Sequence, residues 1–346
     1  MPREGELVLL GKARTGDEDA FGVLIAPYTR ELHVHCYRML GSVHDAEDVL
    51  QEVLVRAWRH LPSFNGPGPV RGWLYRIATN RCLTARSRAV ASIALRPAPQ
   101  ASPAPPPPNA PNVEVTALQP YPDEWLRELA GPADPAASYE LRESVQLAFL
   151  TVIQLLPPRQ RAVLLLRDVL GFSAAETAHI LQASQASVNS ALQRARSTLE
   201  SHQASGRLPQ AKAPAPGTDR ALADRFTAAW HACDIPALVS VLAEDCLLTM
   251  PPAPLAYRGR DAIGAFFATV PAGGDLAAIR LVPTRANGQP AVAAYQRDGA
   301  AARAYGIMVL TVHAGLIGEI TGFADPSLFP LFGLPHQADW LPGQAS

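Results

Sequence analysis

The chain has 346 residues, with 30 basic and 31 acidic side chains and a formal net charge of −1, so any charge that binds nucleic acid must be local. Its four cysteines have neither zinc-motif spacing nor the pattern of a disulfide framework, and no run of about 18 uninterrupted apolar residues indicates a membrane span. We therefore expect a cytoplasmic protein that needs no metal or cofactor and does not associate with a membrane.

The length favours two or three domains, and two proline-rich stretches divide the chain. Residues 97–111 hold eight prolines in fifteen residues, which predicts an extended linker, and residues 206–217 hold three more prolines. The first two blocks have helical periodicity, and the third mixes helices with strands. The expected parts are 1–96, a linker 97–135, 136–206, a linker 207–218, 219–330 and a tail 331–346.

Residues 45–58, DAEDVLQEVLVRAW, predict an amphipathic helix. Its apolar positions recur on one face, while Asp45, Asp48 and Glu52 form an acidic stripe on another. A core helix with a solvated acidic face fits this periodicity as well as a docking helix does.

The charge then changes sign, because residues 53–113 contain no acidic side chain and carry several arginines. Aromatic residues are interleaved with the arginines, including Trp58 and Trp73, of which we expect at least one to be buried. Guanidinium groups bind phosphates and aromatic rings stack on unpaired bases, so the segment suits single-stranded nucleic acid. A helical hairpin with the tryptophans in its core is the alternative.

Residues 45–58 and the following FNGPGPVRGWLYRIATNRCLTARSR (64–88) resemble region two of the sigma-70 family, extracytoplasmic-function (ECF) subfamily. The resemblance implies that the acidic helix docks on the β′ clamp helices of core RNA polymerase. The candidates for this contact are Asp45, Asp48, Gln51 and Glu52. It also implies that the next loop and helix open the −10 promoter element and hold one strand. The candidates for this DNA contact are Arg71, Arg76, Asn80, Arg81, Arg86 and Arg88.

Residues 156–199 predict a helix-turn-helix. Gly171 suits the end of one helix, Ser173 and Glu176 form a capping box for the next, and a short turn leads into a final helix from about Gln185. Polar side chains face outward at the start of that helix, where glutamine and serine can reach base edges and arginines can bind phosphates. A helical hairpin used only for packing remains an alternative.

This block resembles sigma region four, which implies recognition of the −35 element and contact with the polymerase β flap. The −35 candidates are Gln185, Ser187, Ser190, Arg194 and Arg196. Between the two blocks, LQPYPDEWL (118–126) is too apolar for an inert spacer, and it resembles a linker motif of ECF factors with fused C-terminal domains. We expect it to dock on a domain, with an isolated helical turn as the alternative.

Residues 219–330 begin with two amphipathic helices, expected over 219–233 and 235–243, and continue as strands with an Asn287-Gly288 hairpin turn. The block resembles a SnoaL-like domain, in which a curved sheet wraps helices into a cone with a pocket. The apolar segment GFADPSLFPLFGLPHQADWL (322–341), which runs into the tail, should cover some surface. The possible titrating groups are His231, His313, Asp245 and Asp325, and nothing in the sequence pairs them.

The expected fold class is therefore multidomain: two all-α sigma domains, a region-two bundle and a region-four helix-turn-helix, followed by a cone-shaped α+β SnoaL-like domain. The resemblance implies an ECF sigma factor, not an enzyme, that binds core RNA polymerase and promoter DNA. We expect its C-terminal domain to modulate this activity, with an unknown small ligand as a possible occupant of the pocket. The alternatives are a helix-turn-helix regulator that acts without polymerase and an enzyme carried by the SnoaL-like domain.

Overall fold

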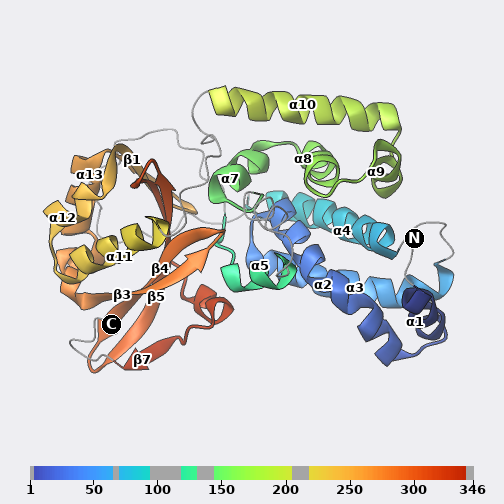
Figure 1. Ribbon diagram of the computed structural model, residues 1–346, viewed down its shortest axis with the longest axis horizontal. Helices are drawn as coiled ribbons and strands as arrows, with labels where there is room; N and C mark the ends of the chain where they lie inside the picture. Colours follow the sequence, from blue (N-terminus) through green and yellow to red (C-terminus); the bar gives the residue numbers. More distant parts are fainter. Residues whose placement is uncertain (1–3, 65–69, 94–117, 131–143, 205–217, 340–346) are drawn as a thin grey trace. The chain divides into compact units, whose positions relative to one another are not determined.

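The computed structural model describes residues 4–64, 70–93, 118–130, 144–204 and 218–339, with side chains along residues 70–93 described as far as Ala85. These residues form two compact units (Figure 1). The first holds both helical blocks, residues 4–93, 128–130 and 148–204 where described. The second holds residues 118–127, 144–147 and 218–339, so part of the linker belongs with the C-terminal domain.

The first block is a bundle of four helices in the described residues, and local capping signals bound the second helix and start the third. They are α1 (Glu4–Arg14), α2 (Glu18–Leu40), α3 (Val43–His60) and α4 (Val70–Ile93), with a short 3-10 turn η1 (Leu61–Ser63). Asp17 caps α2 by accepting from the Ala20 amide, Gly41 ends it at φ 80°, and Ser42 caps α3.

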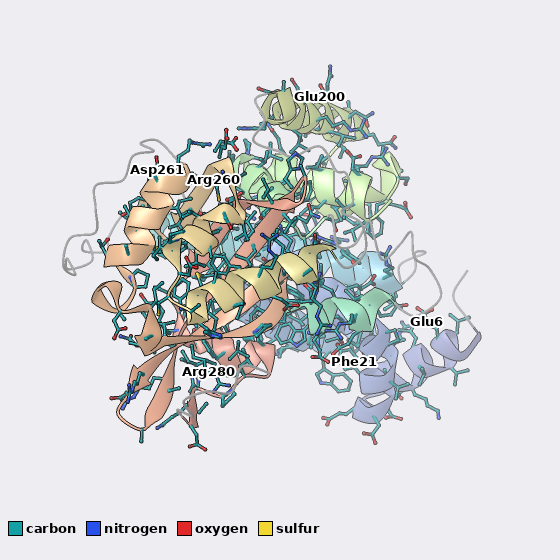
Figure 2. The ribbon with its side chains drawn as sticks, turned by 60° about the vertical axis from the view of Figure 1, so that its left-hand side comes forward. Glu6, Phe21, Glu200, Arg260, Asp261 and Arg280 are labelled. Carbon is teal, nitrogen blue, oxygen red and sulfur yellow. The ribbon has the colours of Figure 1, made fainter. Side chains whose placement is uncertain are left out.

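The apolar face predicted for residues 45–58 is buried, with Val53 and Ala57 fully inaccessible on α3. The expected burial of one tryptophan is wrong, because Trp58 and Trp73 are both only partly buried. Each packs edge-on or tilted against one aromatic neighbour, Trp58 on Phe21 (labelled in Figure 2) and Trp73 on Phe64. Their large rings cover the ends of small clusters and do not fill a core.

The helix-turn-helix forms as the sequence predicts. The elements are α7 (Leu147–Leu155), α8 (Pro158–Leu164) continuing as the π-turn η2 (Leu165–Val169), α9 (Ala174–Leu181) and α10 (Gln185–Ala204). The Ser173 and Glu176 capping box is present at α9. Gln182 takes a left-handed conformation (φ 50°) after α9, and the Ser184 hydroxyl accepts from the Ser187 amide at the start of α10.

The second unit is a mixed sheet with helices on one face (Figure 1). Its helical elements are α5 (Asp123–Ala130, which begins here), α11 (Thr218–His231), α12 (Ile235–Ser240), α13 (Arg260–Thr269), η3 (Pro271–Gly274), η4 (Leu276–Ala278) and η5 (Pro326–Phe332). Its strands are β1 (Leu242–Met250), β2 (Ala253–Arg258), β3 (Ile279–Ala286), β4 (Gln289–Asp298), β5 (Ala301–His313), β6 (Leu316–Phe323) and β7 (Gln337–Asp339).

The strand order is β2-β1-β6-β5-β4-β3, with β7 paired on β5, and the core between sheet and helices is built on Phe226, Trp230 and Phe267. Asn287 and Gly288 take positive φ values of 56° and 74° and close the β3–β4 hairpin, as predicted. The second predicted helix is too long, because α12 ends at Ser240 and the following residues enter β1.

The free edge of β3 is covered by side chains. Trp230 Nε1 donates to the Ile279 carbonyl at 3.1 Å, and the Leu281 amide donates to His231 Nε2 at 3.0 Å. Pro283 has no amide proton, and a β-bridge joins Ala286 to Pro122 of the linker. At the start of α13, Arg260 (Figure 2) donates twice to the Leu242 carbonyl.

The apolar tail covers the other face of the sheet, as expected. Leu328 and Phe329 of η5 are fully buried, and the Phe329 ring packs edge-on against Tyr295 of β4 with centroids 4.9 Å apart. The Tyr295 hydroxyl donates to the Pro335 carbonyl, and the Ala304 amide donates to the His336 carbonyl. The tail is therefore an integral part of the domain as far as β7.

Candidate nucleic-acid and polymerase interfaces

The four polymerase-docking candidates lie on the exposed face of α3. Asp45, Asp48, Gln51 and Glu52 are all solvent-exposed, while the opposite face of the helix is buried. The Glu52 carboxylate forms an ion pair with Arg81 of α4, a residue predicted for DNA. The structure therefore joins two candidates that the sequence gives to different partners.

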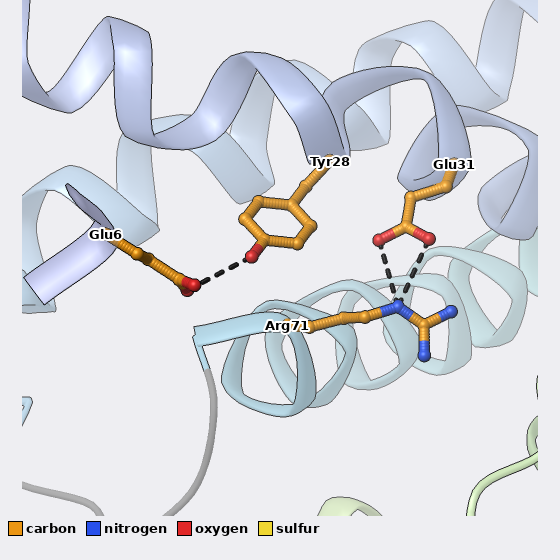
Figure 3. Close-up of polar contacts among 4 residues, drawn as sticks. All are labelled: Glu6, Tyr28, Glu31 and Arg71. Carbon is orange, nitrogen blue, oxygen red and sulfur yellow. Dashed lines mark hydrogen bonds and ion pairs between the residues drawn. The ribbon is translucent and has the colours of Figure 1, made fainter. Parts of the chain in front are cut away.

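Arg71, at the start of α4, is held by the Glu31 carboxylate (Figure 3) and by two aromatic rings. Its Nε donates to both oxygens of Glu31 at 3.1 and 3.2 Å, and its guanidinium carbon lies 5.0 Å from the ring centroids of Tyr75 and Phe172. Burial raises the pKa of Glu31, an effect that the Arg71 charge opposes. Tyr28 on the same helix donates to Glu6 at 3.1 Å.

The remaining −10 candidates are spread along α4. Arg76 and Asn80 are partly buried, and Asn80 Nδ2 donates to the Ile180 carbonyl of α9 at 3.4 Å. Arg86 and Arg88 lie on α4, and their side chains fall outside the described part of the chain. Two −10 candidates, Arg71 and Asn80, thus contact region four within the first unit.

The −35 candidates form an exposed group on α10. Gln185, Ser187, Ser190 and Arg194 are exposed, with Val188 and Ala191 buried behind them. Arg196 is also exposed, but its guanidinium makes a two-bond pair with Asp168 at 2.9 and 2.7 Å. Four of the five side chains therefore face solvent without a described ion pair, and the fifth braces α10 against η2.

The linker docks on the C-terminal domain through three residues, which we name the linker clasp: Tyr121, Asp123 and Asn287. Asn287 is fully buried. Its side-chain Oδ1 accepts from the backbone amide of Tyr121 at 2.8 Å, and its backbone amide donates to the Tyr121 carbonyl at 2.9 Å. Its Nδ2 donates to the Val145 carbonyl at 2.7 Å. One side chain thus binds the chain on both sides of residues 131–143.

Asp123 completes the linker clasp with its two carboxylate oxygens. Oδ1 accepts from the Gly288 amide at 2.7 Å and Oδ2 from Arg285 Nε at 3.0 Å, and the side chain is largely buried. Arg285 also donates to the Gly288 carbonyl at 2.9 Å. The clasp is thus built around the Asn287-Gly288 turn, which the sequence marks only as a turn.

The second unit contains an apolar cavity of about 90 Å³ between the sheet and α13. No Asp, Glu, His, Lys or Arg is among the described residues that line it, and the lining side chains that carry an N–H or O–H group are Trp230 and Tyr305. His231 bonds the edge of β3, Asp325 caps η5, and His313 and Asp245 are exposed. The candidate titrating groups therefore do not converge on the cavity.

Three family models match the chain in this order: Sigma-70 region 2 over residues 24–91, Sigma-70 region 4 over residues 146–199 and a SnoaL-like domain over residues 223–320. The architecture is thus that of a two-domain sigma factor with a fused SnoaL-like domain. The ECF RNA polymerase sigma factor SigG of Mycobacterium tuberculosis is 42% identical over 329 residues, covering 93% of this chain and 85% of the relative. The chain belongs to the ECF RNA polymerase sigma factors.

The ECF RNA polymerase sigma-E factor of Escherichia coli is 33% identical over 196 residues, 56% of this chain and 91% of the relative. Among solved structures, the Mycobacterium tuberculosis ECF sigma factor SigJ shares the fold with a TM-score of 0.57 at 23% identity, over 89% of this chain and 96% of that one. Among the described helices, none has the length and apolarity needed to span a membrane.

Proposed function

We propose that the chain binds core RNA polymerase through the exposed acidic face of α3 and recognises a promoter through α4 and α10. The observation that carries this proposal is the pairing of an acidic, solvent-exposed helix face with an adjacent arginine-bearing helix in one unit. A regulator that binds duplex DNA alone has no use for this combination. In this arrangement Asp45, Asp48 and Gln51 meet the β′ clamp helices, and the exposed start of α10 meets the −35 duplex.

Transcription in vitro with purified core enzyme and a genomic library tests this proposal. We expect discrete start sites preceded by shared −35 and −10 sequences. Specific binding of the protein to duplex DNA without core enzyme, and no transcript with it, would instead favour a helix-turn-helix regulator.

We further propose that the C-terminal domain modulates promoter use by holding the linker. The linker clasp binds the chain on both sides of residues 131–143, immediately before region four begins at α7. Because regions two and four must take the spacing of the two promoter elements on polymerase, a domain that fixes their connection biases which arrangements are populated.

A turn variant separates the linker clasp from the fold of the domain. Asn287→Gly keeps the positive φ of the hairpin and the backbone bond to the Tyr121 carbonyl, and it removes the two side-chain bonds, to the Tyr121 amide and the Val145 carbonyl. Ala314→Gly, in the β5–β6 turn where Ala314 and Gly315 also have positive φ, is the matched control. We expect Asn287→Gly alone to change transcript yield at saturating core enzyme. Equal yields from the two variants and the parent would contradict this role.

The cavity supports ligand binding and not catalysis, since its described lining offers no acid–base pair for proton transfer. Its volume and apolar walls suit a small uncharged molecule, about the size of one aromatic ring. Trp230 lines the cavity, so binding of uncharged toluene should change tryptophan fluorescence in a saturable way. Benzoate, which has a similar ring and a negative charge, should cause no such change. Filling the space with Ala294→Leu should abolish the change, and a toluene response that survives this variant would place the binding elsewhere.

A further inference from the structure

A groove of about 840 Å³ runs between α11 and the edge strand β3 of the second unit. It shares no described lining residue with the apolar cavity beside α13. At one end, His231 at the close of α11 accepts from the Leu281 amide near the start of β3. At the other end, Asp219 in the first turn of α11 interacts electrostatically with Arg285 near the end of β3. Linker residues between 122 and 127 line the groove beside Arg285, so it runs from the linker to the start of β3.

The side chains that line the groove carry more unpaired positive than negative charge. Among the described ones are four arginines and three carboxylates, and Asp123 and Arg285 neutralise each other within the linker clasp. A guanidinium binds a carboxylate with two parallel hydrogen bonds, so a free arginine in a groove favours an organic anion. The other charged groups are three arginines without a described ion pair, Arg127, Arg220 and Arg280 (the last labelled in Figure 2), and two acids, Glu124 and Asp224.

The end of the groove at the start of β3 offers two donors. His231 Nε2 accepts from the Leu281 amide at 3.0 Å, so the neutral ring carries its proton on Nδ1, where it can donate. Burial and the nearby Arg280 charge lower the pKa of His231, which keeps the ring neutral at pH 7. The Arg280 guanidinium and the His231 Nδ1–H group therefore suit one carboxylate.

The middle of the groove has small and apolar walls with one unsatisfied hydroxyl. Ala223 and Ala228 of α11 line it together with Val282 of β3. Thr227 lies among them on α11; it is only 8% exposed, and its hydroxyl has no described partner. Because leaving a buried hydroxyl without a hydrogen bond costs free energy, an acceptor on a bound molecule would stabilise this site.

The linker end of the groove supplies a second cation. Arg220 precedes His231 by eleven residues, about 16 Å along the axis of α11. Asp224 lies one helical turn after Arg220 and repels an anionic group placed toward the middle. Positive groups at the two ends and an uncharged centre thus favour an elongated dianion over a compact one.

We propose that this groove binds a small, elongated dicarboxylate that has a hydrogen-bond acceptor near its middle. One carboxylate binds Arg280 and His231, and the other binds Arg220. The central acceptor takes the bond of the Thr227 hydroxyl. Since linker residues also line the groove, a bound dicarboxylate stabilises the docked linker. This last step alone rests on the proposed role of the linker clasp.

Isothermal titration of the full chain with three seven-carbon acids tests the site. Heptanoate has one carboxylate, pimelate has two, and 4-oxopimelate adds a carbonyl at the central carbon. We expect pimelate to bind about tenfold more tightly than heptanoate, and 4-oxopimelate about threefold more tightly than pimelate. The nine-carbon pair of nonanoate and azelate repeats the first comparison with a longer spacer.

Three variants assign each part of the molecule to its residue. Arg280→Gln should weaken all three seven-carbon acids about tenfold. Arg220→Gln should abolish the advantage of pimelate over heptanoate and leave heptanoate unchanged. Thr227→Val, which keeps the shape of the side chain, should abolish only the advantage of 4-oxopimelate over pimelate. Arg225→Gln is the matched control, because Arg225 is an exposed residue of α11 that does not line the groove.

Dicarboxylates that bind no more tightly than their monoacids at both chain lengths would overturn the proposal, as would equal losses in Arg225→Gln and Arg280→Gln. The linker step has its own test. Asn287→Gly loosens the linker and should lower the affinity for 4-oxopimelate about threefold, whereas Ala314→Gly should not. Binding that is intact in Asn287→Gly would refute the coupling to the linker and leave the site on α11 and β3 standing.

Discussion

Glu52 of α3 and Arg81 of α4 form an ion pair between the helix predicted to bind polymerase and the helix predicted to bind DNA. The Arg81 side chain is only 14% exposed, against 51% for Glu52, so the pair lies at the edge of the helix interface. A charge reversal at Glu52 would place two cations together at this interface as well as altering the protein surface. The docking surface is therefore tested more cleanly elsewhere on α3.

Asp48→Arg is that test, because Asp48 is exposed and takes part in no described ion pair. We expect the variant to lose co-purification with core RNA polymerase, since reversal brings like charges against a basic partner. Its thermal unfolding midpoint should match that of the parent. Normal co-purification of the folded variant would refute the assignment of this face.

Arg194→Ala should weaken −35 binding by the holoenzyme uniformly across promoter sequences. Loss of one phosphate contact lowers the slope of log affinity against log salt by about 1. Arg196→Ala is the comparison. The Arg196 guanidinium is already paired with Asp168, so its removal should change the salt slope less. Equal slope changes in the two variants would mean that the Asp168 pair opens on DNA.

Gln185→Ala should act on sequence preference instead. Gln185 is the exposed first residue of α10, where an amide can pair with a base edge in the major groove. We expect discrimination at one −35 position to fall by about 1–3 kcal/mol, with the salt slope unchanged. Competition assays with single-base variants of a promoter measure this, and an unaltered preference would remove Gln185 from the base-contacting set.

Two buried histidines on α2 make the first unit sensitive to acid. Burial lowers the pKa of His33 to about 4 and that of His35 to about 3, from 6.5. Both stay neutral when folded and take up protons when unfolded. Their stabilisation is therefore complete above pH 6.5 and is lost as pH falls below it, by about 2 kcal/mol for each at pH 5.

Urea unfolding followed by helical circular dichroism at pH 7.5 and pH 5 measures this loss. His35→Gln can keep a bond to Thr79 Oγ1. Between pH 7.5 and pH 5, its unfolding free energy should fall by about 2 kcal/mol less than that of the parent. The same fall in variant and parent would assign the acid sensitivity to other groups.

Phe329→Ala should destabilise the second unit by about 3–5 kcal/mol, because the ring is fully buried against Tyr295. Phe332→Ala, three residues on and only partly buried, should cost less. Trp230 fluorescence during denaturation reports this unit. The same burial means that a chain ending near Pro326 would lose part of its core, so truncation there cannot test regulation alone.

Local signals in the sequence identify the elements well. The Ser173–Glu176 capping box and the Asn287-Gly288 turn each depend on neighbouring residues, and both form as predicted. The end of α12 could not be predicted because Val241, Leu242 and Ala243 continue the apolar pattern after Ser240. Acidic and basic faces could also be placed on their helices, since helical periodicity alone determines which side chains share a face.

What could not be predicted is which distant groups meet. Glu31 and Arg71 are 40 residues apart, and Tyr121 and Asn287 are 166 apart, so no periodicity relates them. Arg161 lies in a recognisable region-four motif and looks like any surface arginine there, yet it is fully buried. Only the packing of region four against α2 makes it an interface residue.

The protected edge of β3 also bears on solubility. Among the described residues, the linker bridges this edge at Ala286, while Trp230 binds the Ile279 carbonyl, His231 binds the Leu281 amide and Pro283 has no amide to offer. An unpaired edge of several residues is a template on which a second molecule can add a strand. Since several of these groups are engaged by the domain's own side chains or are missing, this edge offers an incoming strand fewer partners even without the linker.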